Sequence, residues 1–305
     1  MDGVRDGLTS VIVVTADSGV LLLQCIDRAL ASSARLEIIV VDNASQDGAP
    51  VHAVSAHAGD PRLRLIANAV NRGFGPACNQ GAAAAHGDAL LFLNPDCLIE
   101  ADTIAAMRAV CAADRSIGLL GADVRTPAGA PARGNRRRDP TVRRSVMTFS
   151  GLARFESRWP SLAGVEMNAS ASRVDVERVD AVSGACMYLP RAAFERVGGF
   201  DEGYFLHVED LDLCRRIRDA GFAVAIANAV RVVHVQGSSS RHRPLFVAAH
   251  KRRGMWRYFT KFDAQAQNPA LRALVWLGLW LRLSPNATGR RHIVTITSAI
   301  ILPNP

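Results

Sequence analysis

The chain has 305 residues, of which 49% are hydrophobic and 21% are charged, and this ordinary globular composition argues against disorder. Its formal net charge is +8, with arginines clustered at 133–144 and 241–257. Such clusters suit phosphate groups on nucleic acid, anionic lipid or a pyrophosphate substrate, although a solvated basic face explains either cluster alone equally well. Nucleic-acid binding is disfavoured, because the sequence has no zinc-ligand spacing and only 6% aromatic residues.

The cysteines and the apolar segments indicate a cytoplasmic protein. The six cysteines lie far apart with no C-x-x-C pair, so we expect reduced core residues. The N-terminus lacks the basic flank and apolar length of a signal peptide. No segment reaches the ~18 apolar residues of a membrane span, and "ALVWLGLWL" (273–281) is long enough only to lie in an interface. We therefore expect a cytoplasmic protein that can lie at the inner face of the plasma membrane.

The first half of the chain predicts a parallel sheet. Short apolar runs predict strands at 10–14, 37–41, 63–67 and 89–93, and helical spacing separates them, as in 19–32. Strands without polar alternation, joined by helices, are typical of a sheet covered on both faces. Ligands bind at the carboxyl ends of such strands, where this chain places Thr15, Asp42, Asn68 and Asp96. Four polar strand ends together predict a site for a polar ligand.

The second half has a different pattern. From 122 to 171 it degrades into Arg, Pro, Gly and Ser, which indicates a long excursion with some packed parts. A strand pattern returns at 178–190, a short helix follows and stops at Gly198-Gly199, and another helix with an apolar face precedes Gly221. The run 223–235 predicts a last strand that reaches His234.

Several residues could carry chemistry. Glu209, Asp210 and Asp212 share one helical turn, where negative charge stabilises a helix by ~0.3–1 kcal/mol per group. The same crowding would raise at least one carboxyl pKa and create a general base, and both explanations stay open. His234 read alone is more often a core residue than a ligand. Asp96, fixed by Pro95, can hold a hard divalent cation, although a Pro-Asp turn explains it equally well in isolation.

The segment "NRGFGPACNQG" (71–81) contains three glycines but not the G-x-G-x-x-G pattern of dinucleotide sites. Gly73 and Gly75 allow close approach of the backbone, and Asn79 could begin the next helix.

Six segments in order resemble one family. They are "VIVVT" (11–15), "VVDNASQDG" (40–48), "NRGFGPACNQG" (71–81), "LLFLNPDCLI" (90–99), the segment 182–221 and "VVHVQGSSS" (232–240). The chain resembles the inverting glycosyltransferases of family 2, and most closely their rhamnosyltransferase-like branch. The resemblance implies an α/β GT-A fold, with a mostly parallel central sheet flanked by helices. It implies a catalytic domain at 1–240, with a nucleotide-binding half at about 9–121 and an acceptor half at about 122–240. A helical, membrane-associating extension would follow at 241–305.

The resemblance also implies roles for individual residues. The donor site would comprise Thr15, Asp42 and Asn43, which line the nucleotide pocket, and Arg72, Gly73 and Asn79 in the loop beside ribose and diphosphate. Asn94 and Arg216 would also contact the donor. Asp96 and His234 would bind the metal, Asn94 stands where many members have the first aspartate of D-x-D, and Gly184 and Ala185 would pack against the sugars. Asp210 would be the catalytic base, supported by Glu209 and Arg216. The chain departs from the family at Asn94 and at "ADSG" (16–19).

The implied activity is transfer of a sugar, with inversion, onto a cell-envelope glycan or a polyprenyl-diphosphate-linked acceptor. The expected donor is dTDP-rhamnose, with a UDP-sugar as the alternative, and the expected metal is Mg²⁺ or Mn²⁺. The arginine clusters and 273–281 would hold the enzyme against an anionic membrane surface. The alternatives are a non-catalytic nucleotide-sugar-binding subunit and an NAD-dependent Rossmann oxidoreductase, which the missing glycine fingerprint disfavours.

Overall fold

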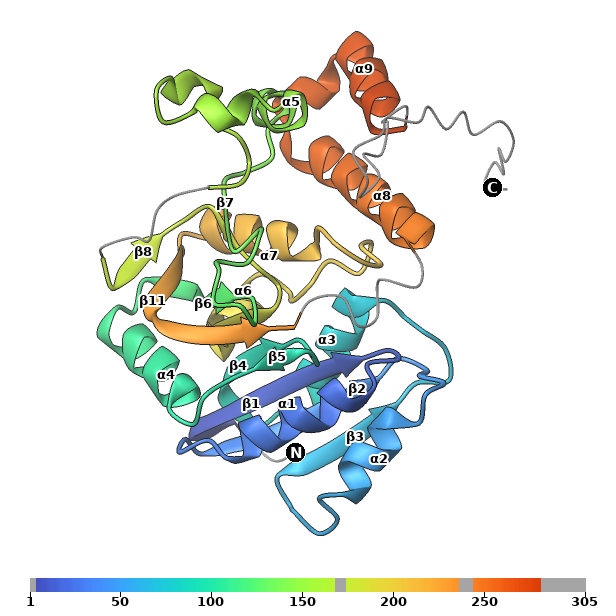
Figure 1. The fold of residues 1–305 in the computed structure, drawn as a ribbon, viewed down its shortest axis with the longest axis vertical. Coiled ribbons are helices and arrows are strands. Elements are labelled where there is room, and N and C mark those ends of the chain that lie inside the picture. The colour runs from blue at the N-terminus through green and yellow to red at the C-terminus, as the bar shows by residue number, and fades with distance from the viewer. Residues whose placement is uncertain (1–3, 168–173, 236–243, 281–305) are drawn as a thin grey trace.

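Nine strands form one twisted sheet at the centre of the molecule (Figure 1). The computed structural model describes residues 4–167, 174–235 and 244–280. The sheet runs in the order β3-β2-β1-β4-β10-β6-β11-β5, with β8 paired to β11. Its strands are β1 (Arg5–Thr15), β2 (Leu36–Asp42), β3 (Leu63–Ala67), β4 (Gly87–Leu93), β5 (Cys97–Leu98), β6 (Ile117–Arg125), β8 (Val176–Arg178), β10 (Cys186–Pro190) and β11 (Ala223–His234).

The four predicted strands at the N-terminal end are confirmed, and they pair in parallel. The next part of the sheet is mixed, because β10 runs antiparallel between β4 and β6. A second, two-stranded sheet joins β7 (Arg136–Arg137) to β9 (Ala181–Val182). The strand pattern predicted at 178–190 is confirmed at β10, but the segment is not one strand: β8 ends at Arg178, and β9 pairs with β7 outside the main sheet.

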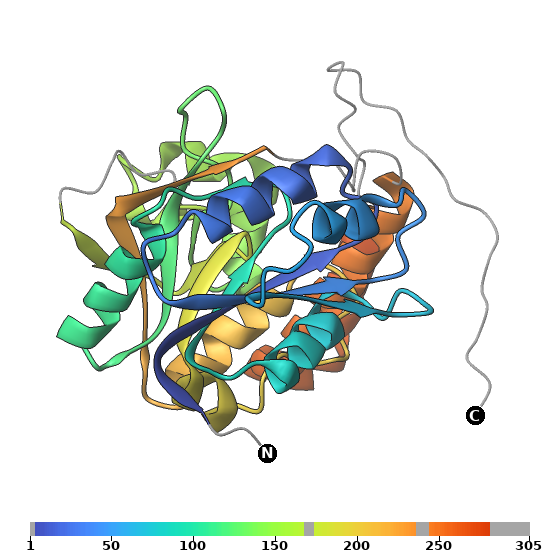
Figure 2. The ribbon, with the colours of Figure 1, turned by 90° about the horizontal axis from the view of Figure 1, so that it is seen from below.

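Helices cover both faces of the sheet (Figure 2). The helices among the described residues are α1 (Val20–Leu30), α2 (Ala49–Ser55), α3 (Phe74–Ala84), α4 (Thr103–Ala113), α5 (Val142–Ser150), α6 (Arg191–Arg196), α7 (Glu209–Asp219), α8 (Pro244–Phe262) and α9 (Pro269–Trp280), with short 3-10 turns at Leu152–Phe155, Pro160–Leu162 and Ala264–Gln267. Of these, α5 and α9 have no buried residues and lie away from the sheet in Figure 1.

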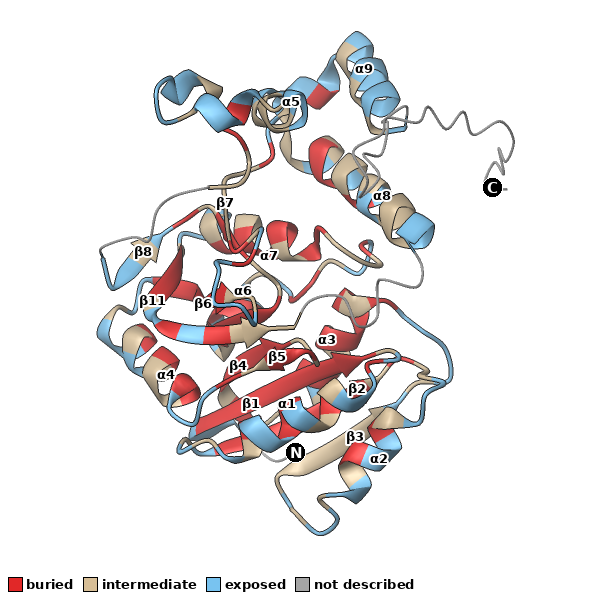
Figure 3. Ribbon diagram, viewed as in Figure 1, coloured by how far each residue is buried: buried red, intermediate tan, exposed pale blue. Residues whose placement is uncertain are grey.

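The alternation of β2 explains the two covered faces. Ile38 and Val40 enter one buried cluster with residues of α1 and α4, whereas Ile39 and Val41 enter another with residues of α3 and α7. The central strands β1 and β4 are red along most of their length in Figure 3, so residues that point to either face of these strands are buried, whereas β3 and β8 are not red. A strand without polar residues is stable only in such a double-sided core.

The excursion that begins at 122 is partly regular. It includes the end of β6, then β7, α5 and two 3-10 turns, while 168–171 lie outside the described residues. The predicted C-terminal helices are present as α8 and α9 (Figure 1). Residues 236–243 and 281–305, which include the end of the 232–240 motif and parts of the extension, also lie outside them. Across the described residues, no helix has the length and apolar character to cross a membrane.

Candidate active site

The carboxyl ends of β1 and β2 bring Thr15 and Asp42 side by side, since these two residues are partners in the parallel ladder. The Thr15 hydroxyl is buried and donates to Ser18 Oγ at 2.8 Å, while Asp42 Oδ1 accepts from the Ser45 amide at 2.9 Å. The predicted edge therefore exists, and it places a carboxylate beside a threonine. Their contact with a nucleotide stays a prediction.

Asn43 braces the loop that precedes α3. Its Nδ2 donates to the Gly73 carbonyl at 2.9 Å, and its Oδ1 accepts from Asn68 Nδ2 at 3.1 Å and from the Arg72 amide at 3.3 Å. Asn43 is only 3% exposed, so these contacts hold a buried amide. Arg72 itself is exposed at the surface of this loop.

Gly73 is required by its surroundings. Its φ of +92° is disfavoured for other residues, and a Cβ there would lie 2.7 Å from the Phe205 carbonyl oxygen. This approach lets the Phe74 amide donate to the same oxygen at 2.9 Å. The prediction that Asn79 begins the next helix is wrong, because α3 begins at Phe74 and Asn79 lies inside it. Asn79 Oδ1 accepts from the Phe200 amide at 2.8 Å and Nδ2 donates to the Phe200 carbonyl at 2.9 Å. The segment 71–81 is therefore fixed to the chain that leads into α7.

Asp96 and His234 meet although 138 residues separate them, because β5 pairs antiparallel with the end of β11. Asp96 Oδ1 lies 2.9 Å from His234 Nε2, and the Val235 amide donates to the Asp96 carbonyl at 2.9 Å. Both side chains are largely buried. The predicted pair is thus brought together.

This pair fits a divalent cation. Asp96, Cys97 and His234 place possible ligand atoms within 4.8 Å of one another, and burial raises the pKa of the Cys97 thiol well above its usual range, so Asp96 and His234 are the better donors to a hard cation. Two ligands at right angles and about 2.1 Å from a cation lie about 3 Å apart, which matches the Asp96–His234 separation of 2.9 Å. Carboxylate and imidazole are suitable donors for such an ion.

Asp210 lies in the first turn of α7, at the end of a strained segment. His207 and Val208 have positive φ values of 66° and 77° without being glycine, and strain of this kind is common at functional sites. Asp210 Oδ2 accepts from Arg137 Nη2 at 2.5 Å and from the Gly184 amide at 3.1 Å, and Oδ1 accepts from the Leu211 amide at 2.8 Å. Arg137 also donates to the Val182 carbonyl, which fixes its guanidinium.

The two neighbouring carboxyls differ in electrostatics. Burial would raise the pKa of Asp210, but the charge and hydrogen bond of Arg137 and the amides of Leu211 and Gly184 outweigh burial and hold it below its usual range. Burial and the charge of Asp210 raise the pKa of Glu209. Glu209 Oε2 is buried and has no hydrogen-bond partner among the residues that the structure describes. Asp210 is therefore held in its ionised form, whereas Glu209 has the higher pKa of the two carboxyls.

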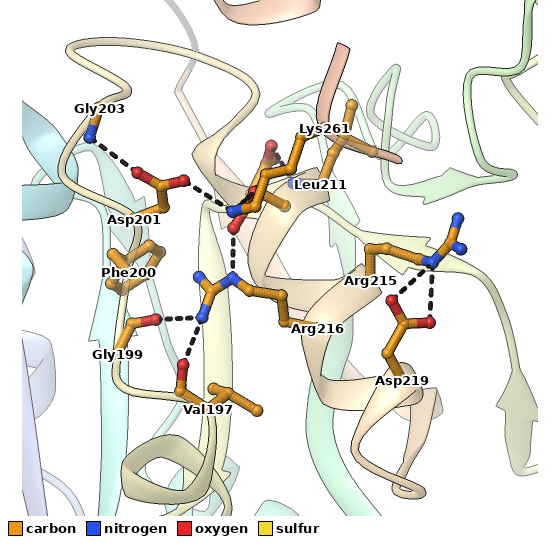
Figure 4. A network of polar contacts seen from close by, with 12 residues as sticks. Val197, Gly199, Phe200, Asp201, Gly203, Leu211, Arg215, Arg216, Asp219 and Lys261 are labelled. Atoms are coloured by element: carbon orange, nitrogen blue, oxygen red, sulfur yellow. Dashed lines mark hydrogen bonds and ion pairs between the residues drawn. The ribbon is translucent and has the colours of Figure 1, made fainter. Parts of the chain in front are cut away.

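Arg216 has a different environment from the one predicted. It donates to Asp212 Oδ1 at 2.5 Å and to the Val197 and Gly199 carbonyls at 2.8 and 2.7 Å (Figure 4). Lys261 of α8 donates to the other Asp212 oxygen at 2.6 Å, and Asp212 is fully buried. These contacts join α7, α8 and the 197–199 turn. A direct contact of Arg216 with the donor stays a prediction that they do not support.

One cavity of about 750 Å³ brings part of the predicted set together. The predicted residues that line it are Asn94, Gly184, Ala185, Glu209, Asp210 and His234. Thr15, Asp42, Asn43, Arg72, Gly73, Asn79, Asp96 and Arg216 do not line it. The cavity also includes Arg137, His207, Lys251 and Arg252, which sequence reasoning left without individual roles. The arginine clusters were the one signal that pointed to this region.

Comparison with known proteins decides the family. The family model described as glycosyl transferase family 2 matches residues 10–164, which is half of the 305 residues. The chain belongs to glycosyl transferase family 2. It is therefore a glycosyltransferase, and both the non-catalytic subunit and the oxidoreductase are set aside. The N-acetylglucosaminyl-diphospho-decaprenol L-rhamnosyltransferase of Mycobacterium tuberculosis is 29% identical over 233 residues, covering 72% of this chain and 74% of that protein. The Escherichia coli rhamnosyltransferase WbbL is 38% identical over 63 residues, 21% of this chain and 24% of WbbL.

Solved structures confirm the GT-A fold. The mannosyltransferase PcManGT from Pyrobaculum calidifontis, in complex with GDP-Man and Mn²⁺, superposes with a TM-score of 0.57 at 20% identity, covering 89% of this chain and 69% of that one. Residues 1–349 of S. aureus TarS in complex with UDP-GlcNAc give a TM-score of 0.57 at 15% identity, covering 90% and 71%.

Proposed function

We propose that this glycosyltransferase transfers rhamnose from dTDP-rhamnose, with inversion, onto a sugar linked to a polyprenyl diphosphate in cell-envelope synthesis. The observation that carries the proposal is that Asp210, Asn94 and His234 line one cavity. A single displacement at an anomeric carbon requires a general base for the acceptor hydroxyl and groups that stabilise the negative charge of the leaving diphosphate. The rhamnosyltransferase relatives support the choice of sugar and acceptor.

In this reaction Asp210 is the base. A hydroxyl oxygen of the acceptor sugar forms a bond to the anomeric carbon while the bond from that carbon to the diphosphate oxygen breaks. The hydroxyl proton passes to Asp210, and the nucleoside diphosphate leaves. The Arg137 contact keeps Asp210 ionised, and the Gly184 and Leu211 amides fix its orientation. Glu209, one residue before it, contributes a buried carboxyl to the same wall.

Asp96 and His234 would hold the Mg²⁺ or Mn²⁺ ion, whose charge, when bound, stabilises the leaving diphosphate. Thr15, Asp42 and Asn43 would contact the nucleobase and the ribose of the donor from the edge of the sheet. Arg72 and Gly73 in the loop before α3, and Asn79 in α3, belong to the segment that we expect beside the diphosphate. A UDP-sugar is the alternative donor.

A donor and variant experiment tests this function. Purified enzyme is incubated with a prenyl-diphosphate-linked N-acetylglucosamine and either dTDP-rhamnose or UDP-sugars, with and without Mn²⁺. We expect rhamnosyl product only with dTDP-rhamnose, and an inverted anomeric centre by NMR. Asp210→Asn should lower kcat by about 10²–10⁴-fold while donor binding is retained.

Asp219→Asn is the matched control, since Asp219 lies at the exposed end of the same helix and pairs with Arg215. Its activity should stay within about twofold of the wild type. Full activity of Asp210→Asn would refute the assignment of the base, and full activity in EDTA would refute the metal role of Asp96 and His234.

A further inference from the structure

Three cations line the cavity apart from the Arg137–Asp210 pair, and we call them the cationic wall. Lys251 and Arg252 lie on α8, and Arg133 lies before β7. Apolar side chains lie between them in the same lining, including Phe149 of α5, Met255 of α8 and Leu279 of α9. The three helices gather above α7 in Figure 1. This end of the cavity therefore combines positive charge with apolar surface.

The cationic wall lies close to the catalytic segment because α8 packs tightly there. A Cβ on Gly254 would lie 2.9 Å from the His207 carbonyl oxygen and 3.0 Å from Val208 Cγ2, so the helix backbone touches the residues just before Glu209. Lys251 lies one helical turn before Gly254. Lys251, His207 and Asp210 line the same cavity, and the charge of Lys251 contributes, after burial, to a lowered pKa of His207. A ligand held by Lys251 in this cavity would therefore have access to Asp210.

Arg252 and Arg133 retain capacity for an anion. Arg252 lies over the Trp280 ring, 6.0 Å from its centroid, and this contact satisfies none of its N–H groups. Among the described residues, no carboxylate forms an ion pair with Arg252. Arg133 lies 3.6 Å from Glu166, but its side chain is 88% exposed, and such a pair is weak. Guanidinium groups bind phosphate oxygens in bidentate geometry, and an ammonium adds a point charge.

We propose that the cationic wall binds the diphosphate of a lipid-linked acceptor and thereby presents the acceptor's sugar hydroxyl to Asp210. This inference rests on the proposed function and names a subsite within it. We assign the donor diphosphate to the side of the cavity near Asp96 and His234. A second anion site near Asp210 would therefore have no ligand if the acceptor were uncharged. A cavity of about 750 Å³ has room for a sugar and a diphosphate.

The apolar residues indicate where the lipid chain leaves. Leu279 lines the cavity, and on the same helix Leu274, Trp276 and Leu277 are exposed by 65%, 49% and 41%. Exposed apolar side chains next to a charged site suit a ligand with one polar and one hydrocarbon end. The first prenyl units would pass along α9.

The test measures binding without any donor, so its outcome does not depend on whether dTDP-rhamnose is the true substrate. The probes are N-acetylglucosamine diphosphate bearing a short prenyl chain and the same prenyl glycoside without phosphate. Calorimetry is done on the full chain and on Lys251→Gln, Arg252→Gln and the double variant. Each single variant should bind the diphosphate probe about 10- to 100-fold more weakly, as expected for a lost hydrogen bond to a charged group. Binding of the phosphate-free probe should change less than twofold.

Two controls separate this role from folding or general charge. Arg253→Gln removes a neighbouring exposed arginine that does not line the cavity, and it should bind both probes like the wild type. Arg252→Lys keeps the charge and should recover part of the affinity. Equal losses for both probes, or no loss for the diphosphate probe, would overturn the proposal. So would variants that lose affinity for phosphatidylglycerol vesicles while they keep affinity for the diphosphate probe, because the wall would then be a membrane contact.

Discussion

Replacement of Arg137 by glutamine should move the pH dependence of catalysis in a defined direction. Arg137 is the charge that lowers the pKa of Asp210, through a contact of 2.5 Å between side chains that are 15% and 13% exposed. Without it, burial dominates and the pKa of Asp210 rises. A base must be ionised to accept a proton, so the acidic limb of the kcat/KM profile should shift to higher pH. Activity at pH 6 should fall more than activity at pH 8.

The same substitution has a cost in stability. Loss of one partner from a buried ion pair typically lowers the free energy of unfolding by about 3–5 kcal/mol. Arg136→Gln is the matched control, because Arg136 is equally buried and pairs with Asp123 and Glu177 on the other side of the strand. Urea titrations should show a comparable loss for both variants, whereas only Arg137→Gln should shift the acidic limb in initial-rate assays. An unchanged limb, or an equal shift in both variants, would refute the electrostatic role of Arg137.

Two further predictions concern stability. Burial opposes ionisation of Glu37, but hydrogen bonds from Ser10 and His86 and the charge of Arg64 lower its pKa from 4.5 to about 2. Its contribution, on the order of 3 kcal/mol, should be present above pH 4.5 and lost towards pH 2, and Glu37→Gln should flatten urea-derived stability across that window. Gly73→Ala should lower the free energy of unfolding by about 2–5 kcal/mol from left-handed strain and overlap with Phe205, whereas Gly48→Ala, with φ +69° and no atom within 4 Å, should lose only about 1–2 kcal/mol; equal losses would refute the steric argument.

The sequence was most informative where local pattern and tertiary environment agree. Apart from Ser10 and Glu37 at their first positions, the strands at 10–14, 37–41 and 89–93 are apolar because both of their faces are buried, so their composition alone predicts them. The division of 178–190 between two sheets could not be predicted from the sequence. A segment that leaves one sheet for another has the same apolar composition as a segment that remains in one sheet. Asp96 and His234 could be paired only through the family resemblance, because nothing local predicts that β5 meets β11.

The residues that surround Asp210 were harder to anticipate. Arg137 belongs to an arginine cluster in which every member has the same local context, and only the pairing of β7 with β9 singles it out. Lys251 and Arg252 depend on the packing of α8 at Gly254, which is a contact between distant segments. Arg216 shows the opposite case: its place on the helix that carries Asp210 led us to predict a contact with the donor, whereas its hydrogen bonds are to Asp212 and two carbonyls.

The meeting of β5 with β11 has a consequence for how the enzyme becomes active during synthesis. Asp96 is made early, but His234 follows 138 residues later, and the two come together only when the last strand joins the sheet. Contacts of such long sequence separation form late and slowly. A nascent or truncated chain that has paired β1 with β2 already has Thr15 beside Asp42, but it has no Asp96–His234 pair until β11 joins the sheet. Truncation before β11 should therefore leave the β1–β2 edge in place and separate the two residues that we propose as metal ligands.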